Sequence, residues 1–315
     1  MEGATSIELD GQYRAIREAA GVLERPGRRI LAIGGAEAGE YLQGQLTNDL
    51  EAANPGEGCY SALLDRKGRM QGDMRVLRTA DGYLIDTEPV AGDAVLRHLS
   101  TYKIGREVTI EDLSPQRTIL SVVGPAASEL ALGGPLGPEH AHREAELDGV
   151  ACLAVATDAG IDLFVAGAEA ASAREALVAA GAEPVSEEAA EIARVESGRP
   201  RFGREMTTAT IPEEAGINDR AVSFTKGCYI GQETVARLHY KGKPNRRLRG
   251  LRLAAPAAAG EAITLAEREL GQIGTAVLSP AFGPIALAIV RREGEPGASV
   301  LVGDGIEAEV VELPF

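Results

Sequence analysis

Short apolar runs separated by tight turns recur through this 315-residue chain, and they constrain its fold more than any other feature. Residues 59–64 and 70–77 flank a turn at 65–68, and a turn at 81–82 leads into a third run at 83–86. Strands joined by such short turns pair with each other in hairpins. A local meander of this kind predicts an antiparallel sheet.

Helical apolar spacing alternates with these strands. Tyr13, Ile16, Ala20 and Leu23 share one face of a helix that we expect to end before Pro26. Further helices are predicted around 41–46, 90–104, 169–180 and 187–195. The chain is therefore expected to be α+β.

The pattern changes near residue 243, after which short strands with frequent glycine continue to the end. That pattern is typical of a small β-barrel. We predict an N-terminal α+β domain at 1–111 that is completed by 186–242, a ferredoxin-like α/β domain at 112–185, and a C-terminal β-barrel at 243–315.

Charge and cysteine content exclude several classes of protein. The chain has 47 acidic and 32 basic residues, a formal charge of −15, which disfavours nucleic acid as a partner. Three widely spaced cysteines favour neither a disulfide framework nor a resident iron–sulfur cluster, and a reducing cytoplasm fits them best. No apolar run approaches the roughly 18 residues that a membrane span needs. His140 and His142, expected in a loop, do not make a metal site, so no bound metal is expected.

One octapeptide concentrates reactive side chains. The preceding Lys226 and a helix expected to open near Gly231 both favour the thiolate form of Cys228, the best nucleophile or redox candidate. The alternative is that Cys228 is a small buried apolar residue. The stretch reads Lys226, Gly227, Cys228, Tyr229, Ile230, Gly231, Gln232 and Glu233.

This octapeptide, with Arg237 downstream, resembles the signature of the YgfZ-type folate-binding proteins. Those proteins are relatives of the glycine-cleavage aminomethyltransferases and are implicated in maintaining iron–sulfur enzymes. The segments 41–49, 61–70 and 194–203 are also similar to that family, in the same order. The resemblance implies an aminomethyltransferase-like fold, tetrahydrofolate as ligand, and iron–sulfur enzymes or their assembly machinery as partners.

The resemblance also implies a folate site. Glu196, near the end of its helix, can accept hydrogen bonds from the edge of a pterin, the alternative being a structural pair with Arg199 or Arg201. Asp73 resembles one member of the acidic pair of the aminomethyltransferases, the alternative being an exposed strand acid beside Arg75.

Asn48 is expected close to the ligand, although such residues commonly serve loops alone. Residues 237–252 carry seven basic residues, including Arg237, and no acid. This stretch suggests an anionic ligand such as the glutamate tail of a folate, with solvated charges or RNA contact as alternatives.

Three functions follow from these observations. The first is a tetrahydrofolate-binding protein that supports iron–sulfur enzymes, with a functional thiol at Cys228 tuned by Lys226. The second is a folate-dependent aminomethyltransferase, for which the acidic pair is incomplete because Gly72 precedes Asp73. The third is a non-enzymatic scaffold in which the octapeptide is only structural.

Overall fold

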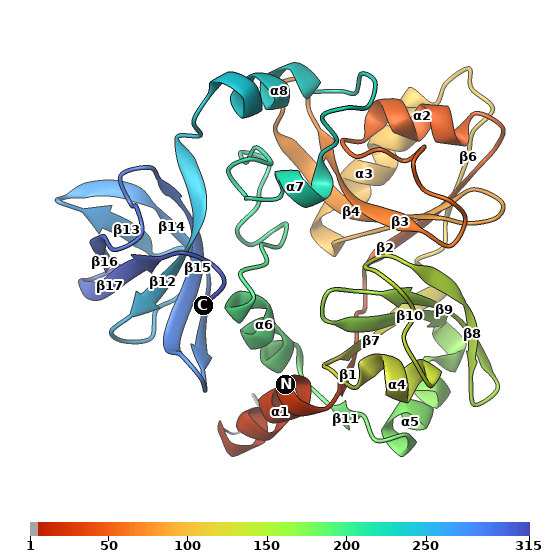
Figure 1. Cartoon of the computed structure of the whole chain (residues 1–315), viewed down its shortest axis with the longest axis horizontal. Helices are drawn as coiled ribbons and strands as arrows, with labels where there is room; N and C mark the ends of the chain where they lie inside the picture. Colours follow the sequence, from red (N-terminus) through yellow and green to blue (C-terminus); the bar gives the residue numbers. More distant parts are fainter. Residues whose placement is uncertain (1–5) are drawn as a thin grey trace. The chain divides into compact units, whose positions relative to one another are not determined.

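The computed structural model describes residues 6–315 and confirms an α+β fold with antiparallel sheets and a C-terminal barrel (Figure 1). The chain forms two compact units. Unit 1 comprises Met1–Leu64, Gln71–Ala190 and Arg220–Ile230, and unit 2 comprises Asp65–Met70, Glu191–Asp219 and Gly231–Phe315. The predicted division into three domains stays a prediction.

A five-stranded sheet in unit 1 carries the predicted hairpin. Its order is β3 (Gly58–Leu64), β4 (Met70–Arg78), β5 (Tyr83–Thr87), β2 (Arg29–Gly34) and β6 (Thr109–Asp112). Helix α2 (Ala38–Gln45) leads toward β3, and α3 (Pro89–Tyr102) follows β5. Pro89 suits the first turn of α3, where its missing N–H costs no hydrogen bond.

A six-stranded sheet completes unit 1. Its order is β11 (Glu183–Pro184), β1 (Gly21–Glu24), β7 (Arg117–Val123), β10 (Gly160–Ala166), β9 (Val150–Ala156) and β8 (His142–Leu147). Strand β1 pairs with β11 in parallel, whereas its pairing with β7 is antiparallel. The accompanying helices are α1 (Ser6–Glu18), α4 (Ala127–Leu132), the 3₁₀ turn η1 (Gly167–Glu169) and α5 (Ala170–Ala179).

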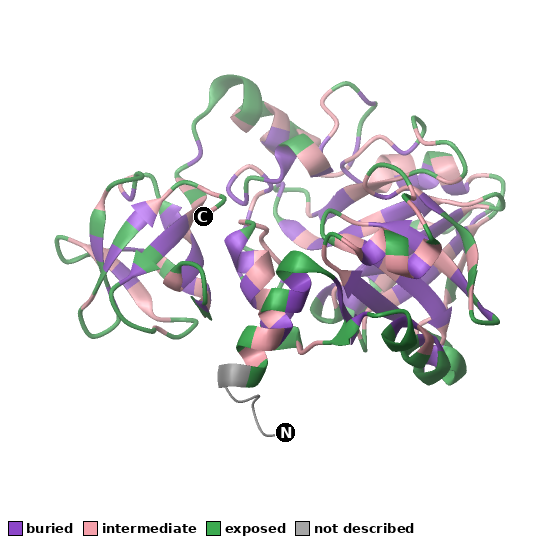
Figure 2. Cartoon of the chain, turned by 60° about the horizontal axis from the view of Figure 1, so that its bottom comes forward, coloured by how far each residue is buried: buried purple, intermediate pink, exposed green. Residues whose placement is uncertain are grey.

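The two sheets of unit 1 share a core and an ionic layer. Ile30, Leu77 and Leu84 of the first sheet form one buried cluster with residues of the second, Ile119, Val155 and Phe164. Figure 2 shows buried residues concentrated on the strands and exposed residues on the connections. Beside this cluster Arg75 donates to Asp86 of its own sheet at 2.7 Å and to Asp162 of the other at 2.6 Å.

Unit 2 is built around a closed barrel. Its strands run in the order β12 (Arg246–Leu253), β15 (Gly283–Arg291), β14 (Arg268–Ser279), β13 (Ala262–Leu265), β16 (Ser299–Val302) and β17 (Ile306–Val311). Closure leaves no unpaired sheet edge, which explains how such short strands are stable. Helix α6 (Glu187–Glu196) crosses from one unit to the other, as does α7 (Asn218–Ala221), and α8 (Gln232–Lys241) precedes the barrel.

Two predictions about local structure were wrong. The first helix ends at Glu18, and the apolar positions at Val22 and Leu23 belong to strand β1, because pairing with β7 and β11 outweighs helical spacing there. Gly21 is required in that strand, since a Cβ would lie 2.7 Å from Val185. His142 is not in a loop but begins strand β8, and both it and His140 are buried.

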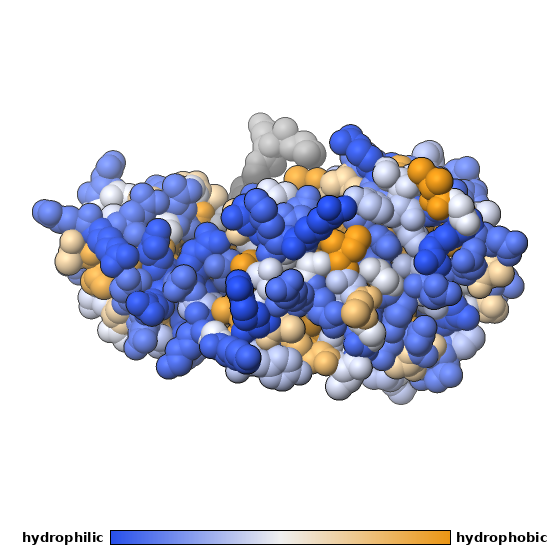
Figure 3. All heavy atoms as spheres, turned by 90° about the horizontal axis from the view of Figure 1, so that it is seen from above, coloured by the Kyte–Doolittle hydropathy of each residue, from blue (hydrophilic) through white to orange (hydrophobic). Residues whose placement is uncertain are grey.

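Hydrophilic residues cover most of the face shown in Figure 3, with small separate hydrophobic areas between them. Among residues 6–315, none of the helices combines the length and the apolar character needed to cross a membrane.

Candidate functional site

The thiol segment (Arg220–Ile230) is fastened to the turn that follows helix α2. Lys226 is buried, and its ammonium donates to three backbone carbonyls, those of Gln43 at 2.7 Å, Leu46 at 2.8 Å and Asn48 at 2.6 Å. Burial is the main cause that lowers the pKa of Lys226, to about 8. The cation therefore lies where the helix macrodipole is negative, at a helix C-terminus.

Four further hydrogen bonds join the same two pieces of chain, and a fifth connects Asn48 to Tyr60 on β3. Asn48 donates from its side-chain amide to the carbonyls of Tyr60 and Arg220, both at 2.8 Å. Thr47 donates from its hydroxyl to the carbonyl of Ala221 at 2.6 Å and accepts, at its own carbonyl, the N–H of Ser223 at 3.0 Å. The N–H of Ile230 donates to the carbonyl of Gly44 at 3.3 Å. Both amide hydrogens of Asn48 are thus engaged within the protein.

Cys228 is exposed on a short stretch that buried residues flank on both sides. Gly227 is also exposed, whereas Lys226 and Tyr229 are buried. The alternative that Cys228 is a buried apolar residue is therefore wrong. The ammonium of Lys226 lies 5.4 Å from the centre of the Tyr229 ring, a cation–π distance, and burial raises the pKa of Tyr229 to about 12.

The remaining motif residues open a helix, as predicted. Gly231 is the N-cap of α8 with φ +83°, a left-handed conformation that favours glycine, and Gln232 and Glu233 form the first turn. Arg237 lies on α8 with its side chain exposed. These four residues belong to unit 2, whereas Lys226 and Cys228 belong to unit 1.

Asp73 has an unusual environment on strand β4. The residue is only 9% exposed, so the alternative that it is an exposed strand acid is wrong. Its Oδ2 accepts a hydrogen bond of 2.6 Å from the hydroxyl of Tyr60 on β3, but its Oδ1 has no partner among the residues that the structure describes. Burial raises the pKa of Asp73 to about 6. A buried carboxylate oxygen without a donor is costly unless a ligand or water supplies one.

Tyr60, the donor to Asp73, is in turn contacted by Arg220, and neither residue was predicted from the sequence as part of the site. Arg220 stacks its guanidinium 5.0 Å from the centre of the Tyr60 ring and forms an ion pair with Glu139. His140, the next residue, adopts a left-handed backbone with φ +72° and has a buried Nδ1 without a partner among residues 6–315. Burial lowers the pKa of His140 to about 4. The only sequence signal for Tyr60 was its place on the strand that pairs with Asp73's strand.

Glu196 is the last residue of α6 and belongs to unit 2. It is 4% exposed, and its Oε1 accepts a hydrogen bond from the hydroxyl of Ser279 at the end of β14. Its backbone carbonyl accepts the N–H of Phe315 at 3.1 Å. A buried carboxylate at a helix C-terminus is disfavoured by the helix macrodipole. Its contacts include a strand of the barrel.

The basic stretch is partly neutralised within unit 2. Arg246 pairs with Glu214 at 2.9 Å and Arg249 with Glu312 at 3.2 Å. The side chains that remain exposed are Arg237, Lys241, Lys243, Arg247 and Arg252.

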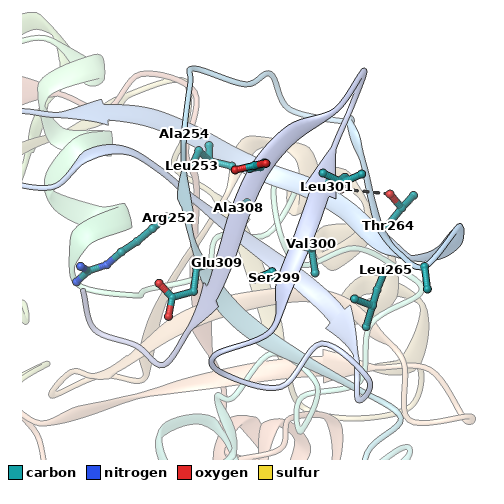
Figure 4. Close-up of a pocket in the computed structure, with 12 residues that line it drawn as sticks. Arg252, Leu253, Ala254, Thr264, Leu265, Ser299, Val300, Leu301, Ala308 and Glu309 are labelled. Carbon is teal, nitrogen blue, oxygen red and sulfur yellow. Dashed lines mark hydrogen bonds between the residues drawn. The ribbon is translucent and has the colours of Figure 1, made fainter.

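Arg252 and Glu309 border a hollow of about 510 Å³ on the outer wall of the barrel (Figure 4). Strands β12, β13, β16 and β17 line it, and Thr264 donates there to the carbonyl of Leu301 at 3.4 Å. The lining residues include none of the predicted catalytic or folate-binding residues. Among the described residues no group of three or more His, Cys, Asp or Glu side chains could hold a metal ion.

Comparisons with known proteins place this geometry in a family. Residues 6–226 match the model of the family described as the GCVT N-terminal domain. A putative chloroplastic transferase of Arabidopsis thaliana is 28% identical over 90% of this chain and 68% of its own length. An aminomethyltransferase of Rubrobacter xylanophilus is 28% identical over 98% of this chain and 86% of its own.

A solved structure shows the same fold. The glycine cleavage system aminomethyltransferase T from Bartonella henselae superimposes with a TM-score of 0.87, covering 99% of this chain and 90% of that one. Its sequence is 23% identical. The predicted aminomethyltransferase-like fold is therefore confirmed.

Proposed function

The chain belongs to the family of the GCVT N-terminal domain, and we propose that it is a tetrahydrofolate-binding protein that supports the assembly or repair of iron–sulfur enzymes. One observation carries the folate part: the buried Oδ1 of Asp73 has no donor among the described residues. A ligand with N–H groups, such as a pterin or a folate-bound amine, would satisfy it.

The residues around Asp73 fit such a ligand. Tyr60 holds one carboxylate oxygen at 2.6 Å and so leaves the other in a fixed direction. Arg220, at the start of the thiol segment, packs over the ring of Tyr60 and is itself paired with Glu139. Bound tetrahydrofolate would supply an acceptor for a one-carbon unit. Asp73, ionised above pH 6, would orient the donor group of that ligand.

Calorimetric titration with tetrahydrofolate tests this proposal. We expect binding by the native protein and a loss of at least about tenfold in affinity for Asp73→Asn, since a hydrogen bond to a charged group is removed. Asp81→Asn, an exposed acid on the following turn, is the matched control and should bind normally. Equal affinity of Asp73→Asn would remove this carboxylate from the ligand site.

Glu196, Arg237 and Asn48 stay predicted folate contacts. Glu196→Ala and Arg237→Ala, titrated in the same way, separate recognition of the pterin from recognition of the glutamate tail. For the tail, monoglutamate and pentaglutamate forms of tetrahydrofolate should bind Arg237→Ala with equal affinity, whereas the native protein should prefer the longer tail. Equal preference in both proteins would exclude Arg237 from tail recognition.

The iron–sulfur part rests on the thiol of Cys228, which is exposed. Cys228→Ala should leave the fold and folate binding intact while failing to restore iron–sulfur enzyme activity in cells that lack this protein. Full restoration by Cys228→Ala would exclude a chemical role for the thiol and favour the scaffold function.

Aminomethyl transfer is a second candidate because several relatives are named aminomethyltransferases. It is tested by incubating the protein and tetrahydrofolate with an aminomethylated lipoyl carrier protein. Formation of ammonia that is lost in Asp73→Asn would favour this activity. Folate binding without ammonia release would favour the accessory function.

A further inference from the structure

The sequence predicts that Lys226 acts electrostatically on the thiol of Cys228. Its contacts instead indicate that it holds the backbone of the thiol segment in place. All three hydrogen atoms of its ammonium have carbonyl acceptors at the end of α2, at 2.6 to 2.8 Å. An ammonium has three donors, so this side chain has none left. The titratable groups that interact with it electrostatically are Asp49, Glu51 and Cys59.

Lys226 is the centre of a row of contacts that runs along the thiol segment. On one side of it Ser223 accepts the Lys226 N–H at 3.2 Å and donates its own N–H to Thr47. On the other side the N–H of Ile230 donates to Gly44. The exposed Gly227 and Cys228 therefore lie between two points at which the segment is fastened.

We infer that Lys226 is a positioning residue, which fastens the thiol segment to the end of helix α2 and thereby holds Cys228 outward in one place. The inference deepens the proposed function, because it concerns how the proposed thiol is presented. A thiol on a fastened segment does not change its position to meet a reaction partner. It therefore suits a macromolecular partner whose surface is complementary to the segment. The lowered pKa of Lys226 agrees with a cation that has exchanged water for carbonyls.

Hydrogen exchange and alkylation of one variant separate the two roles. Lys226→Met keeps the apolar stem and removes both the charge and the three donors. We expect the amides of Ser223 and Ile230 to exchange at least about tenfold faster, the effect of losing a hydrogen bond to a charged group. The amide of Ala62 on β3 donates to the hydroxyl of Thr47 at 2.9 Å but lies outside the thiol segment. Its exchange rate should therefore not change.

Alkylation of Cys228 by iodoacetamide, followed by peptide mass spectrometry across pH, gives the second readout. A positioning role predicts a changed maximal rate with an unmoved midpoint. An electrostatic role predicts a midpoint moved to higher pH with unchanged exchange at Ser223 and Ile230, and that result would overturn the inference. Lys226→Arg, which restores donors and charge, should recover the native exchange pattern in part.

A matched control and a second measurement keep the inference testable. Lys67→Met removes the same charge from an exposed turn and should alter neither readout. If Lys226→Met does not fold, the native protein still decides the question by NMR of its lysine ammonium groups. The Lys226 ammonium should exchange its protons much more slowly than that of Lys67. Equal exchange rates would overturn the inference that Lys226 fastens the thiol segment. None of these readouts requires folate, so failure of the folate proposal is recognised separately by titration.

Discussion

Two aspartates on neighbouring strands of one sheet have opposite environments. Asp73 on β4 and Asp86 on β5 are both buried, at 9% and 0% exposure. Burial raises the pKa of Asp73 to about 6, whereas at Asp86 the same effect is outweighed by Arg28 and Arg75, and its pKa falls to about 2. The neighbours, and not the depth of burial, decide the direction in which the pKa of each carboxyl is shifted.

The contacts explain the contrast. Asp86 accepts hydrogen bonds from Arg28 at 2.7 Å and from Arg75 at 2.7 and 3.0 Å, so both of its oxygens have charged donors. Asp73 has one neutral donor, Tyr60, and one oxygen without a partner in the described part of the chain. A carboxylate placed in this way destabilises the folded protein, and such a cost is typical of functional sites.

The largest expected effect is at the paired aspartate. Asp86→Asn would leave Arg28 and Arg75 buried with too little negative charge, so the free energy of unfolding should fall by about 3–5 kcal/mol. Urea denaturation at pH 7 measures this change. Asp81→Asn, on an exposed turn, should change it by about 0.5 kcal/mol or less. A small loss for Asp86→Asn would show that Asp162 and Glu88 suffice to compensate both arginines.

Asp73→Asn should act in the opposite direction. A pKa raised from 3.8 to about 6 means that the folded protein holds a proton that the unfolded chain releases, so the free energy of unfolding decreases as pH rises from about 4 to 6. Above pH 6 the cost is about 3 kcal/mol at most. Asp73→Asn should therefore be more stable than the native protein at pH 7, by about 1–3 kcal/mol.

Thermal or urea denaturation of both proteins between pH 4 and 7 checks this expectation. The difference between the two should grow through that window and then remain constant. The opposite result would be a free energy of unfolding of the native protein that rises with pH over this range, together with a lower value for Asp73→Asn. That result would mean that Asp73 is paired in solution as Asp86 is.

The sequence predicted the elements on which these aspartates lie but not the difference between them. The turns at 65–68 and 81–82 and the apolar runs beside them located β3, β4 and β5, because hairpins are encoded locally. Arg28 and Arg75 neutralise Asp86, and Arg75 also pairs with Asp162 of the second sheet. Pairings over such sequence separations have no local signal, so Asp86 and Asp73 are alike in the sequence.

The same reason explains the errors. The helix expected through Leu23 gave way to β1 because its partners, β7 and β11, lie about 100 and 160 residues away. Lys226 was predicted to tune Cys228, whereas its ammonium donates to the carbonyls of Gln43, Leu46 and Asn48, nearly two hundred residues earlier. A short motif does not specify the contacts of its residues when their partners lie far away in the sequence.

Tyr60→Phe should have an intermediate effect on the same comparison. The hydroxyl of Tyr60 donates to Asp73 and thereby lowers the pKa of that carboxyl. Its removal should move the titration of Asp73 to higher pH and weaken tetrahydrofolate binding near pH 7, because less of the carboxylate is ionised. Carboxyl-carbon NMR of Asp73 measures the midpoint. Tyr83→Phe, on the next strand, serves as the control, and an equal shift in both variants would assign the effect to general loosening of the sheet.

The smallest effect is expected at a third aspartate of this sheet, Asp112 on β6. Burial alone would raise its pKa, but hydrogen bonds from Ser114 and the guanidinium of Arg29 lower it. Its side chain is 26% exposed, so water already solvates part of the charge. Asp112→Asn should therefore cost about 1 kcal/mol or less in urea denaturation at pH 7. The free energy that an ion pair contributes should increase with the amount of water that the partners replace. A loss of stability as large as that of Asp86→Asn would contradict this rule for the sheet.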